Sequence, residues 1–249
     1  MKYTLLVPAG LIYQEVPAVN VSQAQFHAKL HNGSLEVTMN AHFPSILDAQ
    51  QPVDAFLRAW EVDAHLRGYK IAFSFLDGEV IDRNPEHSGT VVLAAATCIM
   101  SSSFTVMGNI TVSPREYPAP PSWATVSDLA RRMYSRFETY QEKRESIFTS
   151  GYYCLTELQA AAGNSVQRKG RGPAAEHFRI DVNVLNTLGE LTSERGGAQF
   201  ARKAGAPEPT PAEAAWLAAA VPMIIRHVAS VDAGVHVNVL TMVDLPALQ

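Results

Sequence analysis

The periodicity of apolar residues changes near residue 120, and this change constrains the fold more than any other feature. Before it, apolar and polar residues tend to alternate, as in strands that bury one face. After it, apolar residues recur every three or four positions, which is the spacing of an amphipathic helix. The two patterns meet at residues 113–122, a stretch of ten that holds four prolines. Since 249 residues suffice for two domains, we predict an antiparallel sheet domain with one helix and then an all-helical domain, an α+β chain.

The predicted boundaries follow from the prolines, which continue neither a helix nor a central strand and favour an extended connection. We place the sheet domain at residues 1–113, the linker at 114–124 and the helical domain at 125–249. The first 124 residues carry 7 Lys and Arg against 11 Asp and Glu, a net charge of −4, whereas the rest is neutral with 13 of each. The chain as a whole therefore lacks the basic excess of a dedicated nucleic-acid-binding protein.

Two β-hairpins are predicted in the sheet domain. Asn32-Gly33 tolerates the positive φ of a tight two-residue turn, and Asp77-Gly78 repeats the device. The strands predicted by alternation are residues 26–30, 35–39, 71–75, 79–81, 90–100 and 104–112.

One helix is expected in the sheet domain, at residues 53–66 with Pro52 in its first turn. Its apolar face includes Phe56 and Trp60, which we expect to pack against the strands. The acidic and imidazole side chains on the same helix are expected to face solvent, because residues two apart do not face each other: Glu61, Asp63 and His65.

The helical domain opens with Ser127 as the predicted N-cap of a long helix that ends at Gly163. It is one helix, or two nearly collinear helices that break near Gly151. A helix of that length extends its apolar stripe beyond a small domain, so we expect a homodimer formed through it. The last helix is predicted at residues 210–229, with Pro211 in its first turn.

Residues 173–188 match the pattern of a helix-turn-helix. Pro173 suits the start of one short helix, Asp181 suits the cap of the next, and Ala175 provides the small residue at their crossing. Arg179 stands where such a turn commonly has Gly, and the positive φ expected there is costly for Arg. The residues at the expected apolar offsets are Phe178, Ile180, Leu185 and Leu188.

This segment provides the first functional hypothesis, which is contact with DNA or RNA. Basic side chains neutralise phosphates, and amide and hydroxyl side chains on the second helix contact bases. The residues predicted to bind nucleic acid are Arg168, Lys169, Arg171, Arg179, Asn183, Asn186 and Thr187. The alternative is a helical hairpin that belongs to the core of the second domain, with a basic loop in water.

A second hypothesis uses Arg171 and His177 as a catalytic pair. The five residues between them match the Arg-x(4–6)-His spacing of HEPN ribonucleases, which the helical half resembles in this spacing and in being helical. The resemblance implies RNA cleavage without metal, by an Arg and a His that meet across a dimer. The chain departs from the family at Gly172, where a polar residue is common, and Pro173 is expected to leave Arg171 ahead of the helix.

A wider resemblance covers residues 50–245. It is carried by segments of the second half, and they are similar to bacterial proteins of comparable length and two-domain organisation. It implies a bacterial origin and no particular activity. The segments are residues 140–145, 151–158, 188–196 and 201–204.

No motif for a metal or a cofactor is present. The eight histidines form no His-Glu-x-x-His pair, Cys98 and Cys154 form no Cys-x-x-Cys, and no glycine-rich nucleotide motif occurs. We expect no metal site and no cofactor, two reduced thiols, and a cytoplasmic protein without a signal peptide or a membrane span. The sequence thus favours a binding protein over an enzyme, with a ribonuclease and a purely structural or interaction subunit as alternatives.

Overall fold

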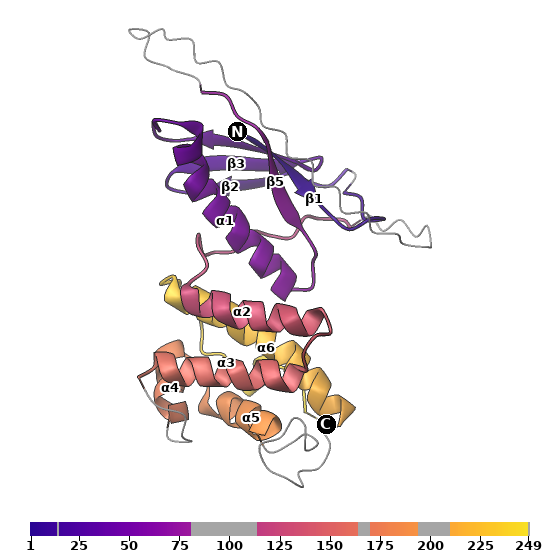
Figure 1. Cartoon of the computed structure of the whole chain (residues 1–249), viewed down its shortest axis with the longest axis vertical. Helices are drawn as coiled ribbons and strands as arrows, with labels where there is room; N and C mark the ends of the chain where they lie inside the picture. The colour runs from indigo at the N-terminus through magenta and orange to yellow at the C-terminus, as the bar shows by residue number, and fades with distance from the viewer. Residues whose placement is uncertain (14, 81–113, 164–169, 194–209, 249) are drawn as a thin grey trace. The chain divides into compact units, whose positions relative to one another are not determined.

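The computed structural model describes residues 1–13, 15–80, 114–163, 170–193 and 210–248, and the chain divides into two compact units at residues 124 and 125. The first unit has a five-stranded antiparallel sheet with one helix, and the described part of the second has five α-helices (Figure 1). The predicted α+β class is therefore confirmed. The strands predicted at 90–100 and 104–112 lie outside the described residues.

The sheet has the strand order β2-β3-β4-β1-β5, and every neighbouring pair is antiparallel. The hairpin at Asn32-Gly33 is confirmed, with φ values of +49° and +72° at the two turn residues. The sequence patterns did not predict the first two strands. The bounds are β1 (Lys2–Leu6), β2 (Val19–Ser22), β3 (Phe26–His31), β4 (Ser34–Met39) and β5 (Ala72–Asp77).

The second predicted hairpin is wrong where the structure describes it. β5 pairs with β1, from Leu6 opposite Ala72 to Lys2 opposite Asp77, and Glu79 and Val80 lie in no strand. Residue 81 lies outside the described residues. The turn signal at Asp77-Gly78 is instead used locally, since Asp77 Oδ1 accepts a hydrogen bond of 2.7 Å from the Gly78 amide. Pairing with β5 gives β1 a hydrogen-bonded neighbour on both of its edges.

Helix α1 (Ile46–Leu66) lies across one face of the sheet (Figure 1). It begins earlier than predicted because Ser45 caps it by accepting a hydrogen bond of 3.2 Å from the Asp48 amide, and Pro52 lies inside the helix. Phe56 and Trp60 are buried as expected, and the Phe56 ring meets the Phe26 ring of β3 edge-on at 5.7 Å.

The opposite face of the sheet carries polar side chains. Lys29 lies opposite Glu36, Glu36 opposite Lys2, and Lys2 opposite Asp77, so the charges alternate across four strands. Opposite charges at facing positions stabilise strand pairing by a few tenths of a kcal/mol up to about 1 kcal/mol each.

The proline-rich segment 114–124 belongs to the first unit and packs on it. Tyr117 is buried, its ring stacks on Tyr13 at 4.6 Å, and its hydroxyl accepts a hydrogen bond of 2.9 Å from the Gly33 amide. The indole N–H of Trp60 donates to the Pro118 carbonyl at 2.9 Å. A segment that we expected as a linker is thus fixed by side chains from distant parts of the sheet unit.

The second unit is built around the contact of α2 with α3 and of both with α6. α4 and α5 pack on each other and on α3, and the two are joined by a short turn. The bounds are α2 (Asp128–Gln141), α3 (Ile147–Ala161), α4 (Arg171–Phe178), α5 (Val182–Ser193) and α6 (Pro211–Asp232). The fully buried core side chains include Met133, Leu158, Leu188, Trp216 and Ile224.

The predicted long helix is wrong. The chain breaks at residues 142–146, where Lys143 has φ of +59° and Ser146 caps α3, and the two helices lie side by side (Figure 1). The physical reason is the apolar stripe, which lapses between Tyr140 and Ile147 and so leaves nothing for a continuous helix to bury. The extended stripe that suggested a homodimer does not exist, and dimerisation itself stays a prediction.

Gly151 lies inside α3 and marks a helix crossing. A Cβ built there would lie 3.0 Å from the Thr192 methyl and 3.3 Å from a Leu188 methyl, both on α5. Leu217 of α6 is also close, at 3.5 Å. The absence of a side chain therefore lets three helices meet.

Candidate functional site

Helices α4 and α5 form the helix pair that the sequence predicted. Asp181 caps α5, since its Oδ1 accepts a hydrogen bond of 2.8 Å from the Asn183 amide. Arg179 occupies the turn with φ of +54° and ψ of +45°, the left-handed conformation expected at this position. Ala175 and the four residues at the predicted apolar offsets are buried. Short-range sequence signals were therefore sufficient to predict the helix pair.

The turn is held by residues far along the chain. Leu240 forms a parallel bridge with Ile180, in which its amide donates to the Arg179 carbonyl at 3.0 Å and its carbonyl accepts from the Asp181 amide at 2.8 Å. On α6, the Nε2–H of His227 donates to the carbonyls of Phe178 and Arg179 at 2.9 and 3.0 Å. Sequence reasoning missed both anchors, because 48 and 61 residues separate them from Arg179 and no local pattern marks them.

Burial shifts the titration of His227. Desolvation lowers the pKa of its imidazole below the ordinary value of 6.5, and the cation of Arg179 acts in the same direction. The two backbone carbonyls and Asp244 act in the opposite direction. The imidazole therefore stays neutral at pH 7 and donates its Nε2 proton to the turn.

Arg171 has a structural role in this arrangement. Its Nη1 donates to Asn186 Oδ1 at 3.1 Å, and its guanidinium lies over the backbone of Gly189. A Cβ built on Gly189 would lie only 2.0 Å from Arg171 Nη2, so the glycine provides the space. The side chain joins the start of α4 to the middle of α5, and the amide oxygen of Asn186 is used in that contact.

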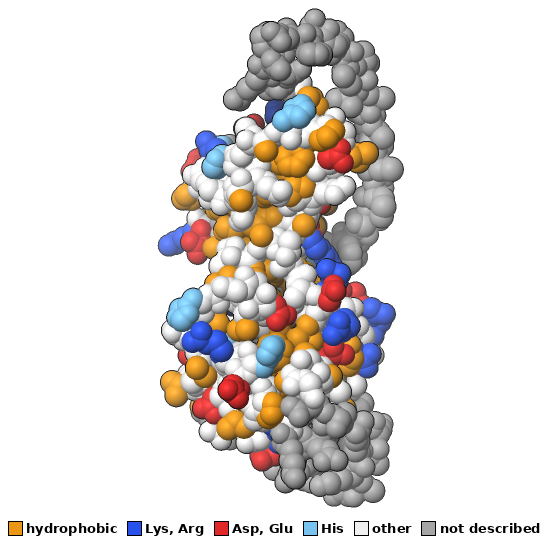
Figure 2. Space-filling view, turned by 90° about the vertical axis from the view of Figure 1, so that its left-hand side faces the viewer, with side chains coloured by type: hydrophobic (Ala, Val, Ile, Leu, Met, Phe, Trp, Pro, Cys, Tyr) orange, Lys and Arg blue, Asp and Glu red, His pale blue; other side chains and the backbone are white. Residues whose placement is uncertain are grey.

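The other predicted contact residues differ in exposure. Arg179 and Asn183 are exposed, Asn186 and Thr187 are half-buried, and Arg168 and Lys169 lie outside the described residues. Residues 170–193 carry two arginines and three acidic residues, a net charge of 2 − 3 = −1. The acidic residues are Glu176, Asp181 and Glu190. The described helix pair therefore provides little positive charge of its own, and on the face drawn in Figure 2 basic side chains lie among acidic ones.

The predicted catalytic pair lies on α4. Arg171 is the first residue of the helix rather than preceding it, and the exposed His177 ring packs edge-on against Phe178 at 4.6 Å. Six helical positions separate two residues by about 9 Å along the axis and by about 120° around it. The two side chains thus lie on different faces of α4, and Arg171 is already engaged by α5.

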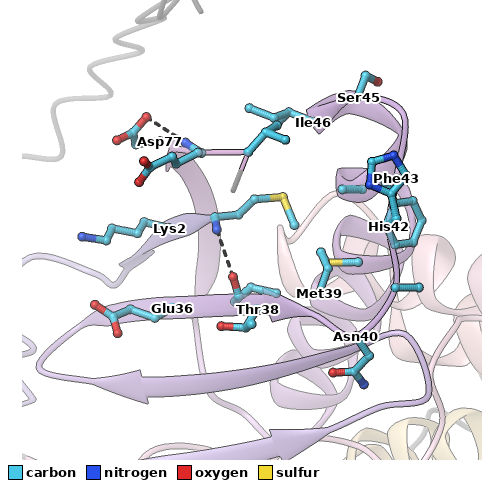
Figure 3. A pocket seen from close by; sticks show the side chains of 17 residues that line it. Lys2, Glu36, Thr38, Met39, Asn40, His42, Phe43, Ser45, Ile46 and Asp77 are labelled. Atoms are coloured by element: carbon cyan, nitrogen blue, oxygen red, sulfur yellow. Dashed lines mark hydrogen bonds between the residues drawn. The ribbon is translucent and has the colours of Figure 1, made fainter. Parts of the chain in front are cut away.

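A cavity of about 1020 Å³ lies in the sheet unit, between the ends of β1, β4 and β5 and the start of α1 (Figure 3). Polar groups in its wall are used in internal contacts. The Met1 ammonium donates to the Val37 carbonyl at 2.9 Å, and the Ser45 hydroxyl donates to Asp48 at 2.7 Å. Its labelled side chains mix Met39 and the Phe43 ring with groups of both charges, a lining that selects no particular ligand chemistry.

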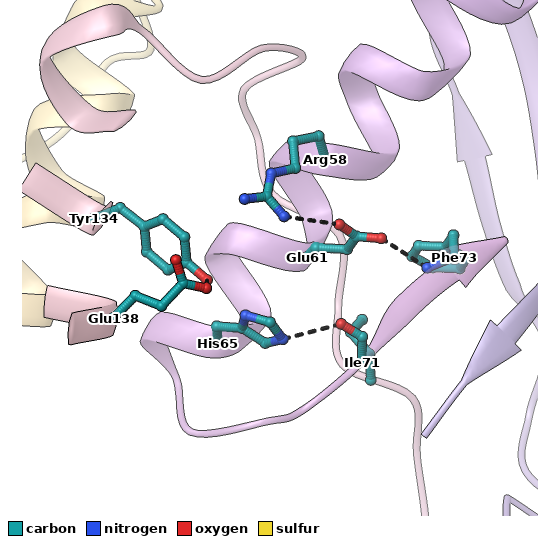
Figure 4. A network of polar contacts seen from close by, with 7 residues as sticks. All are labelled: Arg58, Glu61, His65, Ile71, Phe73, Tyr134 and Glu138. Carbon is teal, nitrogen blue, oxygen red and sulfur yellow. Dashed lines mark hydrogen bonds and ion pairs between the residues drawn. The ribbon is translucent and has the colours of Figure 1, made fainter. Parts of the chain in front are cut away.

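The expectation that Glu61, Asp63 and His65 face solvent is wrong. Asp63 is buried and forms an ion pair of 2.6 Å with Arg67. Glu61 Oε1 accepts from the Phe73 amide at 2.7 Å, and His65 Nε2–H donates to the Ile71 carbonyl at 3.0 Å (Figure 4). Glu61 and His65 fasten the start of β5 to α1, and Asp63 holds Arg67 at the end of α1, so all three serve the fold.

Within the described residues, no group of three His, Cys, Asp or Glu side chains gathers as a metal site. Cys154 is a free thiol in the core of α3, and burial raises its pKa, so it is protonated and unreactive at pH 7. Cys98 lies outside the described residues. Helix α6 is long and apolar enough to cross a bilayer, with a mean hydropathy of 1.5, and half of that window is buried inside the chain.

No protein-family model, no curated protein and no solved structure matches this chain. The resemblances to bacterial two-domain proteins and to HEPN ribonucleases stay predictions.

Proposed function

We propose that this protein is a non-enzymatic binding protein that contacts nucleic acid through α5. The observation that carries the proposal is a firmly held helix pair with amide and hydroxyl side chains on the outer face of its second helix. Asn183 is exposed in the first turn of α5, and Thr187 is half-buried one turn further on. The first turn of the second helix is the part of a helix-turn-helix that reaches base edges in the major groove.

The charges set the strength of this contact. Arg171 is engaged within the protein, whereas Arg179 is exposed and, among the described side chains, contacts only the His236 ring, at 3.5 Å, so we assign the phosphate contacts to Arg179 and the upstream Arg168 and Lys169. Three phosphate contacts correspond to a slope of about −2.7 in a log–log plot of the duplex DNA binding constant against salt. The three acidic residues of the pair oppose binding. We therefore expect weak binding that depends on salt.

The test measures fluorescence anisotropy of labelled duplex DNA and single-stranded RNA, titrated with the full chain at several salt concentrations. Arg179→Ala should weaken binding and make the slope shallower by about 0.9 for duplex DNA, because one phosphate contact is lost. Asn183→Ala should weaken binding without changing the slope. Arg144→Ala is the matched control, since Arg144 is an exposed arginine of the same unit outside the helix pair.

The proposal fails if wild-type protein binds neither nucleic acid at low salt, or if Arg144→Ala weakens binding as much as Arg179→Ala. RNA incubated with the protein in EDTA distinguishes the ribonuclease alternative. Cleavage that disappears in His177→Ala would favour that enzyme, and it would contradict a non-enzymatic role. If the protein shows neither binding nor cleavage, the result would favour a structural or interaction subunit.

A further inference from the structure

The segment that follows α6 has no regular secondary structure and few backbone hydrogen bonds. Gly234, with φ of +70°, follows the end of the helix, and the Val235 amide donates a hydrogen bond to the Ser230 carbonyl. Leu240 then forms the bridge to Ile180. Among the described residues, no backbone hydrogen bond involves residues 236–239. Their amides and carbonyls thus have no backbone partner in the described part of the chain, as at the edge of a sheet.

The side chains of this segment alternate as in a strand. Val235, Val237 and Val239 are β-branched, and His236 and Asn238 stand between them. Val235 and Val237 are half-buried, whereas Val239 is 48% exposed. Further exposed valines occur close by in the chain, since Val182 is two residues from Ile180 and Val243 is three residues from Leu240. An apolar strand edge in water favours pairing with another strand.

We propose that residues 235–239 pair in antiparallel fashion with the same segment of a second copy of this chain, about a two-fold axis at Val237. This register places Val237 opposite its own symmetry mate and Val235 opposite Val239. His236 then faces Asn238. A shift of the register by one residue would place valine opposite a polar residue. Shifts by two residues also place valine opposite valine, but the register centred on Val237 is the one that pairs all three valines.

Charge argues for a second copy as the occupant. Residues 233–243 contain no Lys, Arg, Asp or Glu, so two copies meet no like charges along the paired segment. The segment itself offers a charged partner strand no complementary charge, although Arg179 Nη1 lies 3.5 Å from His236 Nδ1. About a two-fold axis the same surface of each subunit forms the interface, as in most homodimers. Because the paired strand is short, we expect a dissociation constant in the micromolar range.

This inference goes beyond nucleic-acid contact and does not depend on it. It replaces the long helix as the dimer surface, because α2 and α3 pack on each other within one chain.

The experiment measures the mass of the full chain by sedimentation over about 1–500 µM, a range that brackets such a weak interface. Val237→Asp and Val237→Lys each place two like charges opposite each other, so each should raise the dissociation constant about tenfold or more. An equimolar mixture of the two variants should recover the dimer, since Asp then faces Lys. Val243→Asp is the matched control, because Val243 is 94% exposed and outside the paired segment.

A monomeric wild type at the highest concentration would overturn the proposal. Dimers of unchanged affinity in both Val237 variants would also overturn it, as would a mixture that stays monomeric while circular dichroism shows both variants to be folded. The anisotropy assay on Val237→Asp separates the two proposals. If a monomeric variant still binds DNA, nucleic-acid contact is supported and does not need the dimer. If the protein dimerises but binds no DNA, the dimer is supported and nucleic-acid contact is not.

Discussion

The proline-rich segment 114–124 and the α4–α5 turn are irregular stretches of chain whose carbonyls accept hydrogen bonds from distant residues. The first contains prolines, which lack amide donors, and its carbonyls accept from the side chains of Trp60 in α1 and of Arg67, which caps that helix. The second contains Arg179 in a left-handed conformation, and its carbonyls accept from His227 of α6 and the Leu240 amide. Each unit thus uses its longest helix to fix an irregular segment.

The two regions differ in what the anchors leave exposed. In the sheet unit, the polar side chains near the anchored segment are used internally, as with Asp63 and Arg67. At the α4–α5 turn, Arg171 is used internally, whereas Arg179 and Asn183 remain exposed. A polar residue is therefore a candidate for function only if the internal contacts of the fold leave its side chain exposed.

The largest expected effect compares the two buried tryptophans. Trp60→Phe removes the donor to the Pro118 carbonyl and should lower the free energy of unfolding by about 2–3 kcal/mol. Trp216→Phe is the matched control, because nothing in the described part of the chain accepts a hydrogen bond from the Trp216 indole N–H. It should cost about 1 kcal/mol. Urea unfolding of the full chain, followed by circular dichroism, measures both. Equal losses would contradict an anchoring role for Trp60.

The next effect concerns the helix crossing beneath α5. Gly151→Ala should lower the free energy of unfolding by about 1–2 kcal/mol, because overpacking against Thr192 and Leu188 outweighs the better helix propensity of alanine. Gly172→Ala is the control, since no heavy atom lies within 4 Å of a Cβ built there. It should raise the free energy by about 0.5 kcal/mol. A stabilising Gly151→Ala in the same urea assay would mean that the crossing has room for a side chain.

A smaller effect tests the strain of the turn itself. Arg179→Gly should raise the free energy of unfolding by about 0.5–1 kcal/mol, because glycine adopts a positive φ without the steric cost that a Cβ imposes. Arg179→Ala retains the Cβ and should give no such gain. Thermal unfolding of the two variants side by side makes the comparison. A gain of the same size in both would attribute the effect to the lost side chain.

The smallest effect is a pH dependence at the His227 anchor. The folded pKa lies below the ordinary 6.5, so the unfolded chain binds a proton first as the pH falls. This contribution to stability is fully present above about pH 6.5 and declines as the pH drops toward the folded pKa. His227→Gln should flatten the part of the pH profile that lies just below 6.5, measured as the urea midpoint. If His227→Gln leaves the pH profile unchanged, another group is responsible for the pH dependence.

Local signals in the sequence determined much of the fold. The change of periodicity predicted a sheet followed by helices, Asn32-Gly33 predicted its hairpin, and Asp181 predicted the start of α5. These features depend on the conformational preferences of a few neighbouring residues, so a short window of sequence contains the information. The same signals also placed the candidate site on α4 and α5.

Which polar residues of the chain remain exposed depends on tertiary contacts. Arg171 is held by Asn186 and Gly189, Asp63 is buried against Arg67, and His227 reaches the turn from α6. The pairing of β5 with β1 and the break between α2 and α3 were likewise not predicted. The physical reason is that burial and pairing depend on residues brought together from distant parts of the chain. A short window of sequence does not contain these distant partners, so it cannot predict the free energy of burial or pairing.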